Sequence, residues 1–300
     1  MRKIAAFVVS GYPQALVSVI GFTLLSALLP VVGLLGGGCI ALIALKLDWR
    51  RACSVIAGAC AVLAALTLLA GGWQAGVPVI IMTSLLQWLP LTGFAWILRR
   101  HHALSWPLTA ALAAGAAGVL AALPFAELDD WWREALRDYT ALLAADERLT
   151  AALEAIVPVM TGIALSSLVM VWSLMLLLGR WWQSLLDAPG RFRDEFTALQ
   201  IGGGIAILSL AAFAVSTQAE SAVWRQLAIV AAPLFLLQGV AVVHGLLAGL
   251  EQRRLPLAAF YTVLAVITVI EPRLWLLVVL IGLVESLFGL RRRFAPANKD

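Results

Sequence analysis

The sequence predicts an all-α, polytopic integral membrane protein: a bundle of about ten transmembrane helices with both chain ends on the cytoplasmic side. Three observations predict this class. Of the 300 residues, 62% are hydrophobic and only 13% are charged, whereas soluble globular domains have about 45–50% apolar and about 25% charged residues. The apolar residues run in stretches long enough to cross a ~30 Å hydrocarbon core as helices. The basic residues gather in alternate loops between these stretches.

Ten apolar stretches are expected to span the membrane, within a single transmembrane domain over residues 1–300. They are residues 4–29, 31–47, 52–70, 74–98, 103–123, 156–178, 199–218, 224–250, 255–270 and 274–290. A span needs about 20 apolar residues, so the second, ninth and tenth stretches are at the short end of the range. Only Pro30 separates the first two stretches, which predicts a tight hairpin. The first stretch runs to Leu29 without a clear cleavage site and is expected to be an uncleaved anchor.

The distribution of charge predicts the orientation. With the N-terminus inside, ten alternating spans place 16 of the 21 Lys and Arg residues on the cytoplasmic side and five on the other. Because basic residues accumulate in cytoplasmic loops, the predicted topology is N-in and C-in. The net charge of +4 is then a signal of orientation. Bases confined to short loops make no continuous basic face, so no nucleic-acid partner is expected.

The external loop at residues 124–155 carries eight acidic residues and three arginines. Within it, apolar and aromatic residues recur at helical spacing: Leu128, Trp131, Trp132, Ala135, Leu136, Tyr139, Leu142 and Leu143. This pattern predicts an amphipathic helix with its aromatic rings at the level of the lipid headgroups. The helix is expected to shield the ends of the spans, and the alternative is a lid over an outward-facing cavity.

A polar segment at residues 179–199, which we call the elbow, lies on the predicted cytoplasmic side between the sixth and seventh stretches. Residues 179–186 are expected to continue the sixth helix out of the lipid. Trp181 and Trp182 are then expected to anchor the helix at the interface, while Arg180 extends its charge toward water.

The second half of the elbow is predicted to be a fixed corner followed by a short helix. In residues 187–190, Pro fixes φ, Gly permits a positive φ, and Asp can bond to the backbone beyond it. Phe192, Phe196 and Leu199 then follow at helical spacing, with Arg193, Asp194 and Glu195 off that face. The elbow is therefore interpreted as a membrane anchor, or alternatively as a dock for a protein partner or a gate.

The elbow also contains an Arg, a Trp-Gln pair, a Pro-Gly turn, a Phe and a Glu-Phe pair. These residues are Arg180, Trp182, Gln183, Pro189, Gly190, Phe192, Glu195 and Phe196. This motif resembles the signature of the YybS-like family of bacterial multispanning membrane proteins, a family of unknown function. That family is remotely grouped with the substrate-capture subunits of energy-coupling-factor vitamin transporters and with the rod-shape protein MreD. The resemblance implies a location in the bacterial cytoplasmic (inner) membrane.

Two ionisable residues, His244 and Glu285, lie inside predicted spans. At 1.5 Å per residue both are expected ~10 Å below the cytoplasmic interface. Intramembrane ionisable groups are costly and by default indicate function. A His244–Glu285 pair would relay protons or bind a cationic group. In the alternative, Glu285 turns toward Arg291 and Arg292 while His244 bonds to a neighbouring helix.

Two glutamines, Gln87 and Gln238, are expected near mid-span. Pro90 frees a backbone carbonyl close to the Gln87 amide, and such freed groups can build a small polar site. The alternative for both glutamines is hydrogen bonding between helices, which contributes ~0.6–2 kcal/mol. His244, Glu285, Gln87 and Gln238 are thus the candidate substrate-binding or relay residues.

Glycine triplets occur in the second and seventh stretches, at residues 36–38 and 202–204. If the protein consists of two halves of five spans each, the second and seventh stretches hold the same position in the two halves. Glycine-interrupted helices at matching positions of inverted repeats point to a transporter binding site. Close helix packing through small residues is the alternative.

No enzyme signature occurs in the sequence, and no cofactor or metal site is expected: it has no Gly-x-Ser-x-Gly, His-Glu-x-x-His or Walker motif. The expected function is that of a transporter or substrate-capture protein for a small or amphipathic molecule. The alternative is a non-transporting membrane scaffold that recruits envelope or cytoplasmic partners.

Overall fold

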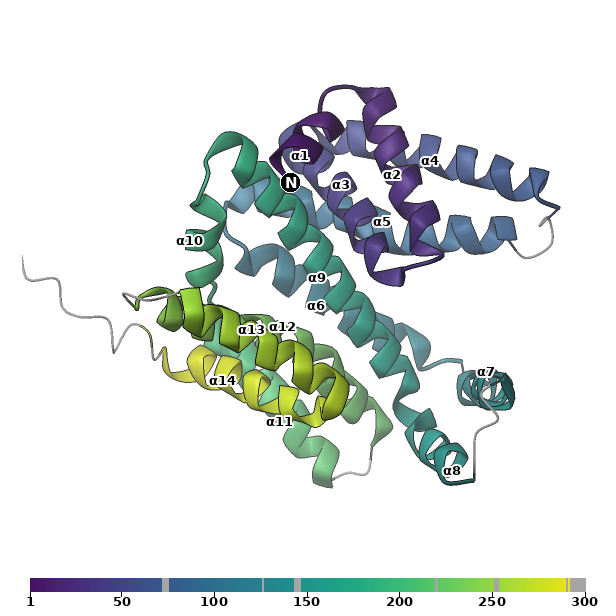
Figure 1. The fold of residues 1–300 in the computed structure, drawn as a ribbon. Helices are drawn as coiled ribbons and strands as arrows, with labels where there is room; N and C mark the ends of the chain where they lie inside the picture. Colours follow the sequence, from purple (N-terminus) through teal and green to yellow (C-terminus); the bar gives the residue numbers. More distant parts are fainter. Residues whose placement is uncertain are drawn as a thin grey trace, which may run out of the picture. The chain divides into compact units, whose positions relative to one another are not determined.

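A computed structural model describes residues 1–71, 76–125, 127–142, 147–218, 221–250, 254–289 and 291. Every regular element in these ranges is helical, which confirms the all-α prediction (Figure 1). The elements are α1 (Arg2–Val8), α2 (Tyr12–Ser26), η1 (Pro30–Val32), α3 (Gly33–Lys46), α4 (Trp49–Leu69), α5 (Gly76–His101), α6 (Ser105–Ala122), α7 (Leu128–Leu142), α8 (Glu147–Ile156), η2 (Val157–Val159), α9 (Met160–Asp187), α10 (Arg191–Thr197), α11 (Gly203–Gln218), α12 (Ala222–Ala248), α13 (Arg254–Ile270), η3 (Pro272–Leu274) and α14 (Trp275–Phe288).

Five helical segments are long and apolar enough to cross a membrane: Trp49–Leu69, Ile81–His101, Ser105–Ala122, Glu147–Asp187 and Ala222–Ala248. The bent pair α1–α2 is a sixth if counted as one span. Shorter apolar helices cover Pro30–Lys46, Gly203–Gln218, Arg254–Thr268 and Trp275–Phe288. Each of the ten predicted stretches therefore overlaps an apolar helix or helix pair. The number of spans and their orientation remain predictions.

The outward surface of these helices is strongly apolar. Leu208 on α11 is 72% exposed, and Leu276 and Leu277 on α14 are 60% and 58% exposed. Soluble proteins rarely expose large contiguous apolar surfaces, because water solvates them poorly. The exposed leucines on apolar helices are instead compatible with contact with lipid.

The first predicted stretch, 4–29, is wrong as one continuous helix. The structure breaks it into α1 and α2, which are bent by 119°. The break falls at Gly11, whose backbone is extended, and Pro13 stands in the first turn of α2. Proline lacks an N–H and fits best in the first turn of a helix, where that N–H would be unpaired, so Pro13 favours the start of a new helix here.

The acidic segment 124–155 contains two helices, α7 and α8, where one was predicted. The tryptophans of α7 differ in environment: Trp131 is 55% exposed, whereas Trp132 donates a hydrogen bond from Nε1 to Thr161 Oγ1 at 2.9 Å. α8 then leads through η2 into α9. Leu143 and the side chain of Tyr139 lie outside the described residues.

The helices group into two compact units. Unit 1 comprises Met1–Ala111 and Met170–Leu199, and unit 2 comprises Leu112–Val169 and Gln200–Asp300. α6 and α9 contribute residues to both units. No boundary in the sequence had indicated this division.

In unit 1, α3 packs against the C-terminal half of α9 through glycines. A Cβ atom added at Gly37 would overlap the side chain of Met175, and one at Gly38 would lie 2.7 Å from Leu178 Cδ2. On the other helix, a Cβ at Gly179 would lie 2.8 Å from the backbone nitrogen of Leu42. The first glycine triplet therefore supports close helix packing.

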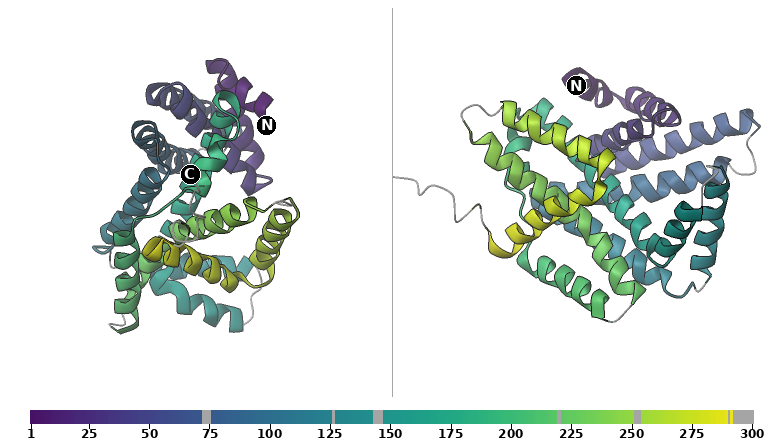
Figure 2. Two further views of the ribbon diagram at one scale, coloured as in Figure 1. Left: turned by 90° about the vertical axis from the view of Figure 1, so that its left-hand side faces the viewer. Right: turned by 60° about the horizontal axis from the view of Figure 1, so that its bottom comes forward.

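In unit 2, α12 and α14 approach until their backbones touch. A Cβ atom at Gly239 would overlap the carbonyl oxygen of Val278, and one at Gly282 would overlap that of Phe235. The second glycine triplet packs less tightly. Gly202 and Gly204 have open space around them, and only Gly203 approaches α14, at 3.3 Å from Ser286 O. Figure 2 shows α11, α12 and α14 of this unit from two further directions.

The α12–α14 contact yields a stability prediction. Gly282→Ala and Gly239→Ala are each expected to destabilise the protein by about 1–3 kcal/mol, because the helices must separate to admit a methyl group. Unfolding of the purified protein in detergent, followed by its transition temperature, measures the effect. Gly204→Ala on α11 is the control and is expected to leave the transition unchanged or raise it slightly. Equal behaviour of all three variants would contradict the proposed backbone contact.

Candidate functional site

Pro90 interrupts the hydrogen bonding of α5 because it has no N–H to bond the carbonyl of Leu86. The structure supplies a replacement donor from α9. Trp172 Nε1 donates to Leu86 O at 3.1 Å, and its ring packs edge-on against Phe94 with centroids 5.4 Å apart. The freed carbonyl predicted from the sequence is therefore present but already paired.

Pro233 interrupts α12 in the same way and leaves the carbonyl of Ile229 without its helical partner. Ser166 Oγ, again on α9, donates to Ile229 O at 3.0 Å. Trp172 acts within unit 1 and Ser166 within unit 2. One helix thus satisfies the backbone at both internal prolines.

Gln87 follows Leu86 on α5 and is half-buried. In the part of the chain that the structure describes, its side-chain amide makes no hydrogen bond. An amide offers two donors and an acceptor with two lone pairs. Gln87 is therefore the predicted candidate whose polar atoms remain available to a ligand.

Gln238 is fully buried on α12 and has a structural role. Its Oε1 accepts a hydrogen bond from the backbone N–H of Ile201 at 2.5 Å, and its Nε2 donates to Gly282 O at 3.1 Å. Ile201 lies in the non-helical stretch before α11. The amide thus joins α12 to α14 and to that stretch, as the alternative of hydrogen bonding between helices predicted.

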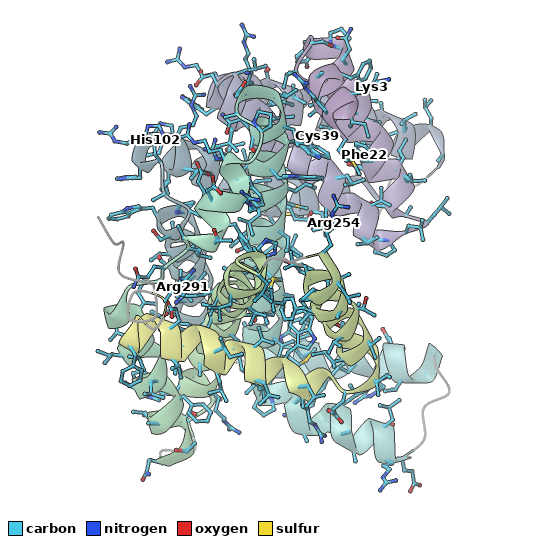
Figure 3. All side chains as sticks on the ribbon, turned by 60° about the vertical axis from the view of Figure 1, so that its left-hand side comes forward. Lys3, Phe22, Cys39, His102, Arg254 and Arg291 are labelled. Atoms are coloured by element: carbon cyan, nitrogen blue, oxygen red, sulfur yellow. The ribbon has the colours of Figure 1, made fainter. Side chains whose placement is uncertain are left out.

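His244 and Glu285 have separate partners. His244 Nδ1 lies 2.8 Å from the hydroxyl of Tyr261 on α13. Glu285 is buried, and its Oε1 and Oε2 accept hydrogen bonds from Arg291 Nε at 2.9 Å and from the Arg291 backbone N–H at 3.2 Å. Arg291 is labelled in Figure 3. These contacts match the alternative in which each residue bonds on its own.

The elbow has the predicted geometry. α9 ends at Asp187, and Gly190 has φ +99°, a left-handed conformation that favours glycine. α10 begins at the next residue. Ser184 Oγ donates to Ala188 O at 3.2 Å and accepts from the Phe192 N–H at 3.3 Å, so one hydroxyl bonds both sides of the turn.

A part-buried ion pair closes the elbow. Arg180 Nε donates to Glu195 Oε2 at 2.7 Å, and Arg180 Nη2 donates to Glu195 Oε1. Their side chains are only 12% and 16% exposed. Arg191 Nε adds a bond to Oε1 at 2.9 Å, and Gln183 Oε1 accepts from Arg180 Nη1. Such bidentate, charge-assisted contacts are strong and geometrically specific.

The electrostatics of Glu195 follow from these contacts. Burial by itself would raise the pKa of this carboxyl. The hydrogen bonds and charges of Arg180 and Arg191 outweigh burial and hold the pKa of Glu195 below its ordinary value of 4.5. Glu195 is therefore ionised at neutral pH and locked to α9.

The elbow is also tied to the C-terminus of α3. Gln183 Nε2 donates to Leu45 O at 3.3 Å, and Lys46 forms an ion pair with Asp187. Arg99, at the end of α5, donates to Ala44 O and Leu47 O, both at 3.0 Å. Cations at a helix C-terminus interact favourably with its unpaired carbonyls and its dipole.

Two expectations for the elbow are corrected. Trp182 is 1% exposed and belongs to the core of unit 1, so its prediction as an interface anchor is wrong. Arg180 does not extend its charge toward water, because Glu195 pairs with it. Phe192 and Phe196 stack with ring centroids 5.9 Å apart, but α10 ends at Thr197, so Leu199 of the predicted apolar face lies beyond the helix. Pro189 lies in the turn, next to Gly190.

The described helices define an all-α protein with several segments compatible with a membrane. Comparisons of the chain with known protein families, with curated proteins and with solved structures found no match. Among the described residues, no group of three or more His, Cys, Asp and Glu side chains is placed to hold a metal ion.

The Arg180–Glu195 pair yields a prediction for mutation. Glu195→Gln removes the charge and one strong acceptor, so we expect a loss of about 1.5–3 kcal/mol, the range for hydrogen bonds to charged groups. The effect should be coupled to Arg180→Gln, with the double variant losing less than the sum of the two. Asp194→Asn is the matched control, because Asp194 is 72% exposed. Full additivity in the cycle would contradict a direct pair.

The same pair makes stability depend on pH. The pKa of Glu195 in the folded protein is depressed. The contribution of its ionised carboxylate to the free energy of unfolding is therefore present above pH 4.5 and is lost as the pH falls through the folded pKa. The difference in unfolding temperature between the parent and Glu195→Gln should therefore be full at pH 7 and shrink below pH 4.5. A difference that persists unchanged at low pH would indicate a packing effect in place of the ion pair.

Proposed function

We propose that this chain is a multi-pass protein of the bacterial cytoplasmic membrane that transports or captures a small or amphipathic molecule. The observation that carries this proposal is the unpaired amide of Gln87 in an apolar helix. An unsatisfied polar group costs several kcal/mol in hydrocarbon. A polar group of a ligand would relieve that cost.

The surroundings of Gln87 suit such a role. The amide stands one turn before Pro90, beside a carbonyl that Trp172 already occupies. A ligand at Gln87 would therefore meet an amide with free donors and acceptor, while the carbonyl of Leu86 stays occupied by Trp172. The YybS-like resemblance of the elbow is compatible with this function and with the scaffold function. Without a nucleotide-binding loop in the sequence, transport would draw on an ion gradient or a partner ATPase.

A ligand screen on the purified protein tests the proposal. Vitamins, amino acids and lipid precursors are titrated while the unfolding temperature is recorded. We expect one class to stabilise the parent and to bind at least tenfold more weakly to Gln87→Leu. The ligand-free variant should be at least as stable as the parent, since removing an unpaired polar group costs no hydrogen bond and relieves its exposure to hydrocarbon.

Gln218→Leu, at the exposed end of α11, is the control and should bind like the parent. A compound that stabilises the parent and Gln87→Leu equally would place the site elsewhere. A screen in which no class stabilises the parent would favour the scaffold function.

The scaffold function is favoured by one feature, the exposed outer side of α10. Arg193 and Asp194 are 53% and 72% exposed there, on a helix that the part-buried Arg180–Glu195 ion pair joins to α9. A cytoplasmic or envelope protein would dock on this side. Co-purification with a partner that is lost in an Asp194→Arg variant would distinguish this function from transport.

The proposed topology is N-in and C-in with ten spans. The contacts of Arg99 and Lys46 with the ends of α3 and α9 support it, because they gather three predicted cytoplasmic loops at one end of unit 1. Reporter fusions after Gly72, within 135–150 and after Gln218 should report an external location. Fusions after Arg51, Arg100, Arg254 and Asp300 should report an internal one. An internal signal within 135–150 would overturn the orientation.

A further inference from the structure

The termini of several helices lie together at one end of unit 1. Arg99, in the last turn of α5, reaches the carbonyl of Leu47, two residues before α4 begins at Trp49. α6 follows α5 after a short connection that includes His102, which is labelled in Figure 3. The C-terminus of α5 and the N-termini of α4 and α6 therefore share this end.

Three exposed tryptophans mark this end, and each carries a basic side chain on its ring. Trp49, Trp96 and Trp106 are 45%, 46% and 57% exposed. The guanidinium carbons of Arg50 and Arg100 lie 5.6 Å from the ring centroids of Trp49 and Trp96, respectively. The ring of His101 stacks on Trp106 with centroids 4.6 Å apart. We call these six residues the Trp–cation rim.

The arginines of the rim differ from four other cations at this end. Lys46, Arg180, Arg191 and Arg193 form ion pairs with carboxylates. Within the described part of the chain, Arg50 and Arg100 have tryptophan rings as partners and no carboxylate. A guanidinium that stacks by its face keeps the N–H donors along its edge, which match a phosphate in bidentate geometry.

The three tryptophans indicate which class of phosphate compound binds to the Trp–cation rim. A free anion in water would gain little from three exposed indoles. Trp side chains prefer the boundary between lipid headgroups and acyl chains, with the ring in the apolar region and the N–H in the polar one. The adjoining helices α4, α5 and α6 are apolar enough to continue into hydrocarbon. The rim therefore fits a lipid headgroup with its chains attached.

We propose that the Trp–cation rim is a docking surface for anionic phospholipid headgroups, with Arg50 and Arg100 binding the phosphates. Anionic lipids supply the complementary charge, and each basic residue near such a surface contributes about 1 kcal/mol. The proposal is independent of what the protein transports.

Titration of the full-length protein in detergent tests the proposal. Phosphatidylglycerol and phosphatidylcholine are added separately, and the unfolding temperature gives the half-saturating concentration of each. We expect phosphatidylglycerol to be preferred. Arg50→Gln and Arg100→Gln should each raise its half-saturating concentration about fivefold, the equivalent of about 1 kcal/mol, and leave the response to phosphatidylcholine unchanged.

Arg225→Gln is the matched control. Arg225 also follows an exposed tryptophan, Trp224, but the structure shows no stacking between them in the described region. This variant should bind phosphatidylglycerol like the parent. An equal loss in Arg225→Gln would overturn the proposal, because binding would then reflect total charge.

Two further outcomes also decide the matter. If inorganic phosphate stabilises the protein as strongly as phosphatidylglycerol, the rim is an anion site and not a lipid dock. The two arginine variants are measured singly, so that failure of one to fold leaves the other informative. An unchanged response to phosphatidylglycerol in a folded variant of either arginine would overturn the proposal.

Discussion

The fold depends on one constraint: a helix in an apolar environment must have all of its backbone N–H and C=O groups paired within the protein. α9 satisfies this constraint for two other helices. Its Trp172 and Ser166 bond the carbonyls that Pro90 and Pro233 leave open. The non-helical stretch before α11 meets the same demand through Gln238, which bonds the Ile201 N–H. At both internal prolines, a side chain of α9 is thus in place to pair the backbone carbonyl that the proline leaves open.

The same demand explains why most intramembrane polar residues are poor ligand candidates. Gln238, His244 and Glu285 contact protein groups, and the contacts of Gln238 hold the helices of unit 2 together. Gly239 and Gly282 also hold this unit together, because without side chains they let the backbones of α12 and α14 come into contact. Among the four candidates, Gln87 is the one whose side chain makes no hydrogen bond in the described residues, and for that reason the proposed function is built on it.

Helix positions could be predicted from the sequence because long apolar stretches determine them, and each of the ten stretches overlaps an apolar helix. The bend at Gly11 was missed because the interruption of the apolar run at residues 10–14 is short, although Pro13 could have signalled it. The elbow's turn was predictable from its Pro-Gly pair. The burial of Trp182 was not, since a tryptophan at a helix end has the same local pattern in a core and at an interface. Partners such as Arg180 and Glu195 depend on tertiary contacts that periodicity does not encode.

The division into units has a consequence for the order of folding. Every residue of unit 1 precedes residue 200, including both sides of the elbow and the end of α3 that it contacts. Domains generally fold as they are synthesised, N-terminal parts first. Unit 1 can therefore be complete before any residue beyond 199 is translated. Unit 2 differs, because the bond from Gln238 to Gly282 requires α14, which follows every residue of unit 1 in the chain.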